Sequence, residues 1–188
     1  TAAQVEALGR RALPLVFDVT DADAVQNAVA SVVEQLGRVD ILINNAAVGR
    51  DRDRVPVEAL APEVFQHVLD VKVRGTFLST QAVLKQMYAQ NNGGKIVNIS
   101  SIAGKRGSAH TLAYNAANFA IIGMTQSMAS EFGERGINVN CVCPGQVATS
   151  RMDSVRPDDA VVSQSGAAPV GRWGTDEEVA HLVAFLCT

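Results

Sequence analysis

Short apolar runs alternate with longer stretches of helical periodicity along this chain. Four apolar runs have the length and composition of buried strands: residues 13–19, 39–44, 95–100 and 137–143. Apolar residues at helical spacing predict helices over residues 20–36, 62–88, 111–132 and 176–186. Strands that alternate with helices of this length are joined by crossovers, so the pattern predicts an α/β fold with a doubly wound parallel sheet.

Polar residues at the predicted helix ends agree with this division. Thr20 is expected to cap the first long helix, and Asp21 and Asp23 favour its positive end. Gly37 is expected to end that helix, and the run 91–94, Asn-Asn-Gly-Gly, to end the second. In doubly wound sheets ligands bind beyond the carboxyl ends of the strands. The residues that follow the strands are therefore expected to share one cleft: Asp18, Asn44 to Ala47, Ser100 to Ala103, and Pro144 to Thr149.

Composition and charge exclude several classes of protein. A length of 188 residues with 47% apolar content predicts a single domain, residues 1–188. The net charge of −3 gives no basic surplus for nucleic acid. The chain has no apolar stretch near the roughly 20 residues that cross a bilayer and no signal-peptide pattern at its start, so we expect a cytoplasmic protein with no membrane partner.

The three cysteines are Cys141, Cys143 and Cys187. On a strand Cys141 and Cys143 point to the same face, and they lie too close in sequence for an easy disulfide. Reduced thiols are expected. No His or carboxylate cluster accompanies them, so no metal site is predicted.

Five short motifs follow one another in a fixed order. Each alone has an ordinary explanation, because Asn-rich and Pro-Gly turns are common loops and a helical tyrosine usually packs. In chain order they are Asp18-Val19, Asn44-Asn45-Ala46-Ala47, Ser100-Ser101, Tyr114, and Pro144-Gly145-Gln146-Val147-Ala148-Thr149. Their order and spacing together resemble the short-chain dehydrogenase/reductase family, including 3-oxoacyl-acyl-carrier-protein reductases, over essentially the whole chain.

This resemblance implies a Rossmann-type fold and interconversion of a ketone or 3-oxoacyl group and a secondary alcohol by hydride transfer. Ser101 would bind the substrate oxygen and Tyr114 would transfer the proton. The cofactor would be NAD or NADP, and the substrate a small carbonyl or alcohol compound with Gln146, Arg151 and Met152 on its side. Cofactor contacts are implied for Asp18, Val19, Asn45, Ala46, Ala47, Tyr114, Asn118, Pro144, Gly145, Val147 and Thr149.

Two positions depart from the family pattern. The family has a lysine four residues after its tyrosine, where this chain has Asn118, and commonly an asparagine where it has Lys72. In one hypothesis Lys72 supplies the ammonium while Asn118 holds the ribose, so both belong to the catalytic set. In a second, hydride transfer is lost or slow, and the chain is a pseudoenzyme for binding or oligomer assembly. In a third, both are simple substitutions in an incomplete copy. A cofactor-independent member of the fold is a further alternative.

The resemblance also implies that parts of the fold lie outside this sequence. The family's first strand–helix–strand unit, with its glycine-rich phosphate loop, and its last strand are not found here, which predicts a fragment. In the sheet order 3-2-1-4-5-6, residues 13–19 and 39–44 would be separated by two further strands, so we expect no direct pairing between them. A homodimer or homotetramer is expected through the helices that start at Pro62 and Thr111. Small residues there would allow close helix packing or would pack on the sheet: Ala116, Ala120, Gly123 and Ser127.

Overall fold

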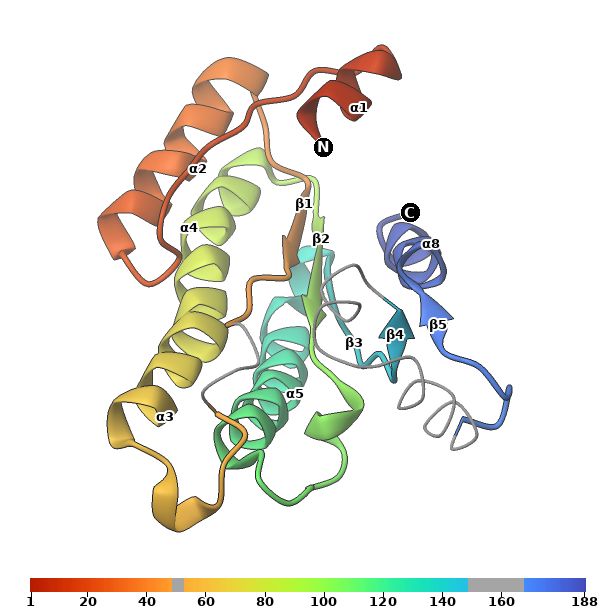
Figure 1. Cartoon of the computed structure of the whole chain (residues 1–188). Helices are drawn as coiled ribbons and strands as arrows, with labels where there is room; N and C mark the ends of the chain where they lie inside the picture. Colours follow the sequence, from red (N-terminus) through yellow and green to blue (C-terminus); the bar gives the residue numbers. More distant parts are fainter. Residues whose placement is uncertain (49–52, 149–167) are drawn as a thin grey trace.

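The computed structural model describes residues 1–48, 53–148 and 168–188 (Figure 1). Its α-helices are α1 (Ala2–Ala7), α2 (Ala22–Leu36), α3 (Pro62–Leu69), α4 (Gly75–Gln90), α5 (Leu112–Phe132) and α8 (Asp176–Leu186). Its strands are β1 (Ile41–Asn44), β2 (Gly94–Ile99), β3 (Ile137–Val142), β4 (Val147–Ala148) and β5 (Gly174–Thr175). The described residues also form four short helical segments: η1 (Val57–Ala59), η2 (Asp70–Arg74), η3 (Ile102–Gly104) and η4 (Gly133–Arg135).

The central sheet is parallel, as predicted. It has three strands in the order β1-β2-β3, with Ile41 opposite Lys95 and Gly94 opposite Ile137. β4 and β5 form a second, two-stranded parallel ladder. Just before β1, the side-chain amide of Gln90 takes the place of a strand partner: it donates to the Val39 carbonyl at 2.9 Å and accepts from the Val39 N–H at 2.8 Å. The first strand is thereby fixed to the end of α4.

Helices cover both faces of the sheet, which is the doubly wound arrangement. Figure 1 shows α2, α4 and α5 on one side of the strands and α8 on the other. The core between α4, α5 and the sheet is formed by Val83, Met87, Ile96, Phe132, Ile137 and Val139. No helix in the described part of the chain is long and apolar enough to cross a membrane.

The strand predicted over residues 13–19 is absent, so this prediction was wrong. Residues 10–18 have no regular secondary structure, and Val16 is fully exposed at 104% of its reference area. Because residues 10–18 form no strand, the expected separation of this segment from β1 by two further strands stays a prediction. β1 was also expected to be covered on both faces, yet Ile41 and Ile43 are 45% and 46% exposed. An apolar run becomes a strand only when a neighbouring strand completes its hydrogen bonds.

The N-terminus of α2 differs by one residue from the prediction. The cap is Asp21, whose carboxylate accepts from the N–H groups of Asp23 at 2.9 Å and Ala24 at 3.1 Å. Thr20 instead donates its hydroxyl to the Asp18 carboxylate at 2.8 Å. The prediction for Gly37 is confirmed, because it ends α2 in the left-handed conformation at φ 90°. Thr and Asp are both good N-cap residues, so the sequence alone does not decide whether Thr20 or Asp21 caps the helix.

A wide helical turn interrupts the second long helix. The helix begins with Pro62 in its first turn, as predicted, but residues 70–74 form a π-helical turn, η2, between α3 and α4. Such insertions are rare and frequently occur at functional sites. This turn contains Lys72, one of the two residues that depart from the family pattern.

Candidate active site

A cavity of about 570 Å³ lies where the carboxyl ends of the parallel strands approach α8. This size is within the usual range for small-molecule sites, roughly 300–1,000 Å³. Among the described residues, those lining it come from the ends of β1 and β2, the loops after β1, β2 and β3, the short strand β4, and the helices α5 and α8. They are Ile43, Asn45, Ala47, Val48, Ile99, Ser100, Ser101, Tyr114, Pro144, Gly145, Val147, Asp176, Val179, Ala180 and Val183. We call this cavity the cleft.

Most of the residues predicted from the motifs meet in the cleft. The structure brings together the Asn45–Ala47 turn, Ser101, Tyr114 and the turn that begins at Pro144. Ala47, which stands where the resembling family has glycine, has no positive φ, so a side chain is tolerated there.

Other predicted residues lie away from the cleft lining. The described residues that are not in the lining are Asp18, Val19, Ala46, Lys72, Asn118 and Gln146, while Thr149, Arg151 and Met152 fall outside the described residues. The Val19 side chain packs on α4, where a Cβ built on Gly75 would lie 2.8 Å from Val19 Cγ2. Hydrogen bonds from the backbone and hydroxyl of Thr20 lower the pKa of the Asp18 carboxyl.

Ser101 is positioned by the short segment η3 that follows β2. It is 9% exposed, and its Oγ accepts a hydrogen bond from the Ala103 N–H at 3.2 Å. The next residue, Ile102, donates its N–H to the Pro144 carbonyl at 2.9 Å and so joins the serine loop to the turn after β3. Because the Ser101 oxygen already accepts one bond, its own O–H remains able to donate toward the cleft.

Tyr114 lies in the first turn of α5 and is half-buried in the cleft wall. The helix approaches the serine loop closely because residue 104 is glycine. A Cβ built on Gly104 would stand 2.7 Å from both the Asn118 carbonyl oxygen and Ser100 Oγ. The absence of a side chain at this position lets Ser101 and Tyr114 face the same cavity.

Asn118 is one turn beyond Tyr114 and is almost fully buried, with 1% exposure. Its side-chain amide donates to the Tyr114 carbonyl at 2.8 Å, and its own backbone carbonyl accepts from Ser100 Oγ at 2.9 Å. The side chain is therefore turned along the helix. The backbone carbonyl of Asn118, which accepts from Ser100 Oγ, joins α5 to the end of β2.

Lys72 is buried on the same side of the sheet, with 7% exposure. Its ammonium Nζ donates to the Ile99 carbonyl at 2.6 Å, two residues before Ser101. Burial lowers the pKa of Lys72, and the charge interaction with Cys141 opposes this shift. The π-helical turn thus directs a cation to the carboxyl end of β2.

Polar side chains form a hydrogen-bonded chain between the carboxyl ends of β1 and β2 and the helices α4 and α5, and the motifs did not predict it. Asn44 Nδ2 donates to Thr80 Oγ1 at 3.2 Å and to Asn98 Oδ1 at 2.9 Å. Asn98 Nδ2 donates in turn to Thr125 Oγ1 at 2.9 Å, so the chain links α4, both strands and α5. Its sequence signal was Asn98 itself, a polar residue inside the apolar run 96–99.

Replacing Asn98 by Ala is expected to lower the free energy of unfolding by about 2 to 3 kcal/mol. The change removes two hydrogen bonds of Asn98, one from Asn44 Nδ2 and one to Thr125 Oγ1, each worth about 1 kcal/mol, and leaves a small cavity at a fully buried position. Urea denaturation of Asn98→Ala beside Asn92→Ala, at an exposed loop position, measures the effect. Equal unfolding midpoints for the two variants would show that the buried chain adds no stability.

α8 contributes a wall that the motifs did not predict. Thr175 caps the helix in a reciprocal arrangement with Glu178, and Asp176 in the first turn reaches the cleft lining. Asp176 is the one charged side chain among the described lining residues. Within the described ranges no group of three or more His, Cys, Asp or Glu residues comes together as metal ligands would.

Comparison with known proteins gives the family. The model for short chain dehydrogenases matches residues 1–160. A 3-oxoacyl-[acyl-carrier-protein] reductase of Thermotoga maritima is 37% identical over 185 residues, which are 98% of this chain and 73% of that protein. The chain belongs to the short-chain dehydrogenase family, whose members among its relatives are reductases and dehydrogenases.

Solved structures share the fold. The gluconate 5-dehydrogenase of Burkholderia cenocepacia, in complex with NADP and tartrate, has a TM-score of 0.90 at 29% identity, and the match covers 100% of this chain and 72% of that one. An NAD⁺-bound xylitol dehydrogenase has a TM-score of 0.89 at 34% identity, covering 100% of this chain and 76% of that one. The predicted α/β fold of Rossmann type is therefore confirmed, as is the predicted family.

Proposed function

We propose that this chain is a nicotinamide-dependent oxidoreductase that interconverts a ketone or 3-oxoacyl group and a secondary alcohol. The main support is that Ser101 and Tyr114 line one cavity together with the turns that begin at Asn45 and Pro144. A hydroxyl that binds the substrate oxygen and a phenol that transfers the proton are the two groups that such a reaction needs on one side of the carbonyl.

The residues of the cleft fit the nicotinamide end of NAD or NADP. Residues of the Asn45–Ala47 turn and of the Pro144–Val147 turn line the same cavity, and a Cβ built on Gly145 would meet nothing within 4 Å. A flat ring amide would be held by backbone groups of these turns, with Val147 against the ring. Bound there, the cofactor supplies or accepts the hydride. The described lining has no Lys or Arg for the cofactor phosphates.

The work of this chain's own residues is proton transfer and orientation. In reduction, Ser101 Oγ–H donates a hydrogen bond to the carbonyl oxygen while the Tyr114 phenol delivers a proton to it. In oxidation the same phenolic oxygen takes the proton from the alcohol. The side chains of Ile99, Val179 and Val183 make the surrounding wall apolar, which strengthens these hydrogen bonds by excluding water.

Asn118 supports the second candidate function: a catalytically impaired member of the family that acts as a binding or oligomer-assembly protein. An uncharged, 1% exposed side chain stands where the family pattern places a cation, and its amide is engaged by the Tyr114 carbonyl. Loss of this electrostatic assistance would slow the proton transfer, since general acid–base catalysis contributes on the order of 10²- to 10⁴-fold.

An absorbance assay on the reduced nicotinamide separates the two candidates. The chain is mixed with NADH or NADPH and a panel of 3-oxoacyl thioesters and polyol-derived ketones, and cofactor binding is measured in parallel by fluorescence. The oxidoreductase proposal expects substrate-dependent loss of absorbance. Cofactor binding without turnover on any ketone would favour the impaired protein, and failure to bind either cofactor would contradict both nicotinamide-based candidates.

Lys72 is expected to supply part of the missing positive charge from the opposite helix. For an illustrative separation of about 10 Å and an effective dielectric constant of about 20, two unit charges interact by roughly 1.7 kcal/mol, which corresponds to roughly 10- to 20-fold in rate. Lys72→Ala and Lys72→Met are therefore expected to lower turnover about tenfold, most strongly at low pH in the oxidation direction. Lys85→Met, at an exposed position of α4, is the matched control. A fully active Lys72→Ala protein contradicts this role.

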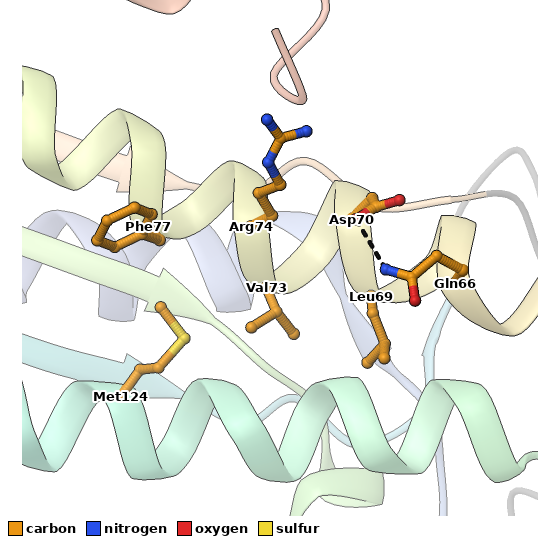
Figure 2. Close-up of a pocket in the computed structure, with 7 residues that line it drawn as sticks. All are labelled: Gln66, Leu69, Asp70, Val73, Arg74, Phe77 and Met124. Atoms are coloured by element: carbon orange, nitrogen blue, oxygen red, sulfur yellow. Dashed lines mark hydrogen bonds between the residues drawn. The ribbon is translucent and has the colours of Figure 1, made fainter. Parts of the chain in front are cut away.

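The predicted homodimer or homotetramer remains a proposal, and the helical face opposite the sheet supports it. A groove of about 450 Å³ runs between the α3–η2–α4 helix and α5, lined by Leu69, Val73, Phe77 and Met124 and edged by Arg74, Asp70 and Gln66 (Figure 2). Phe77 and Phe119 are 46% and 47% exposed on these helices. The outer face of α5 also presents Gly123, beside which a Cβ would meet open space.

Replacing Phe119 by Glu is expected to shift the chain to monomers, because a buried charge at a helix interface has no compensating partner. Light scattering after size-exclusion chromatography measures the mass. Phe185→Glu, on exposed α8, is the control and should leave the mass unchanged. An unaltered oligomer in Phe119→Glu, or a monomeric unmutated chain, would contradict this interface.

A further inference from the structure

Two thiols stand side by side directly before the turn that lines the cleft. Cys141 lies in β3 and Cys143 just beyond it, and their Sγ atoms are 3.8 Å apart. Both are free and half-buried. The proposed oxidoreductase chemistry uses neither of them.

The local backbone allows these thiols to come closer. Two residues apart on a strand, Cα atoms are separated by roughly 6.6 Å, near the upper end of the 4.4–6.8 Å or so seen in disulfides. β3 ends at Val142, whose carbonyl accepts from the Ser100 N–H at 2.8 Å. Cys143 follows the strand and precedes Pro144, so the chain can bend there without opening the β2–β3 ladder.

We propose that Cys141 and Cys143 form a reversible disulfide that moves the Pro144–Val147 turn and so changes the cleft. The disulfide itself does not depend on the proposed function. Its effect on turnover does.

The oxidant is a low-molecular-weight disulfide such as oxidised glutathione. Cys143 lies beyond the end of β3, whereas Cys141 lies within the strand and burial raises the pKa of its thiol, so we assign the first attack to Cys143. That sulfur bonds to one sulfur of the oxidant, and the first small thiol leaves. Cys141 Sγ then loses its proton and attacks Cys143 Sγ, and the second small thiol leaves. In sum, two protein thiols are oxidised and one small disulfide is reduced to two thiols.

The strain expected from the tight spacing makes this disulfide easy to reduce. Strained disulfides have higher reduction potentials and are typical of regulatory rather than structural bonds. The pair is thus suited to change between dithiol and disulfide as the ratio of oxidised to reduced small thiols changes.

Backbone contacts connect the thiol pair to the cleft and to Trp173, whose fluorescence can report on a change at the turn. The Pro144 carbonyl accepts from the Ile102 N–H at 2.9 Å, so bending at Cys143 pulls on the Ser101 loop. After the turn, β4 pairs with β5, and Trp173 lies immediately before β5 with 7% exposure. Because the chain has a single tryptophan, its fluorescence reports on this region alone.

The test uses the full chain with Cys187→Ser, which removes the third thiol. The protein is incubated with increasing ratios of oxidised to reduced glutathione and followed by thiol titration, intact mass and Trp173 emission. Cys141→Ser and Cys143→Ser in the same background are the matched variants. We expect loss of both thiols with a mass decrease of two hydrogen atoms, a shift in Trp173 emission, and full reversal by dithiothreitol.

The two single-cysteine variants distinguish the first attack on glutathione from the closure of the disulfide ring. Cys141→Ser should stop at a glutathione mixed disulfide on Cys143, and Cys143→Ser should stay unmodified at the same ratio. If turnover is established, oxidation should lower it on the order of 10²-fold, as a shift of about 1 Å in a positioned group can. Retention of both thiols, or stable glutathione adducts without ring closure, overturns the disulfide. Ring closure with unchanged Trp173 emission and unchanged cofactor binding overturns its coupling to the cleft.

Discussion

Tyr114→Phe is expected to lower turnover on the order of 10²- to 10⁴-fold, with little change in stability. The substitution removes only the phenolic oxygen, and a positioned proton donor contributes a factor of this size. The ring remains in the cleft wall, so cofactor binding should be preserved. Steady-state rates of nicotinamide oxidation, with binding measured separately, give kcat apart from affinity.

The other tyrosine of the chain provides the control. Tyr88 packs at the far end of α4, where the Arg135 guanidinium lies 4.2 Å from its ring centroid. Tyr88→Phe keeps that ring and should leave turnover unchanged. If Tyr114→Phe keeps the full rate, proton transfer passes through another group and the proposed mechanism is wrong.

Asn118→Lys is expected to raise turnover on the order of 10²-fold. Position 118 is one helical turn from Tyr114, and an ammonium extended along this face would favour the phenolate form of the tyrosine. A cation lowers the pKa of a nearby phenol, so in the oxidation direction the rate should reach its plateau at a lower pH than in the unmutated chain. A free tyrosine titrates at about pH 10, far above neutrality.

Asn118→Met separates charge from the loss of the buried amide. Both variants remove the hydrogen bond from Asn118 Nδ2 to the Tyr114 carbonyl, but only lysine adds a charge. pH–rate profiles of the three proteins should show the gain and the pH shift in Asn118→Lys alone. Equal profiles for the Lys and Met variants would mean that position 118 does not control the proton transfer.

The elements predicted correctly are those whose signals are local. Asp176–Leu186 is a helix because its cap and apolar spacing lie within one segment, and β2 combines a dense apolar run with a glycine-rich break before it. Residues 13–19 have an equally apolar run, but strand formation also requires a neighbour, and pairing is not encoded in the run itself. The π-helical turn at Lys72 was missed for a similar reason, since apolar periodicity does not distinguish it from one α-helical turn.

For the site, residue spacing predicted which strand ends would meet and could not predict side-chain direction. Ser101 and Tyr114 meet in the cleft because the parallel topology fixes where their elements end. Asn118 lies on the same helix, yet its short amide finds a carbonyl within its own helix and stays buried. Asp176 could not be found from motifs, because its place in the cleft depends on how α8 packs across the sheet.

The outer edge of β1 has a consequence for handling this polypeptide. β1 ends the three-stranded sheet, with Ile41 and Ile43 nearly half exposed, and the apolar side chains of Val16 and Phe17 are exposed as well. Among the described residues no strand pairs with this edge of β1, and an unpaired edge with apolar neighbours is a template for intermolecular β-pairing, which protein sheets ordinarily avoid with charged residues or proline. Self-association of the isolated polypeptide should therefore rise steeply with concentration, and Ile41→Lys or Ile43→Lys is the substitution best placed to suppress it.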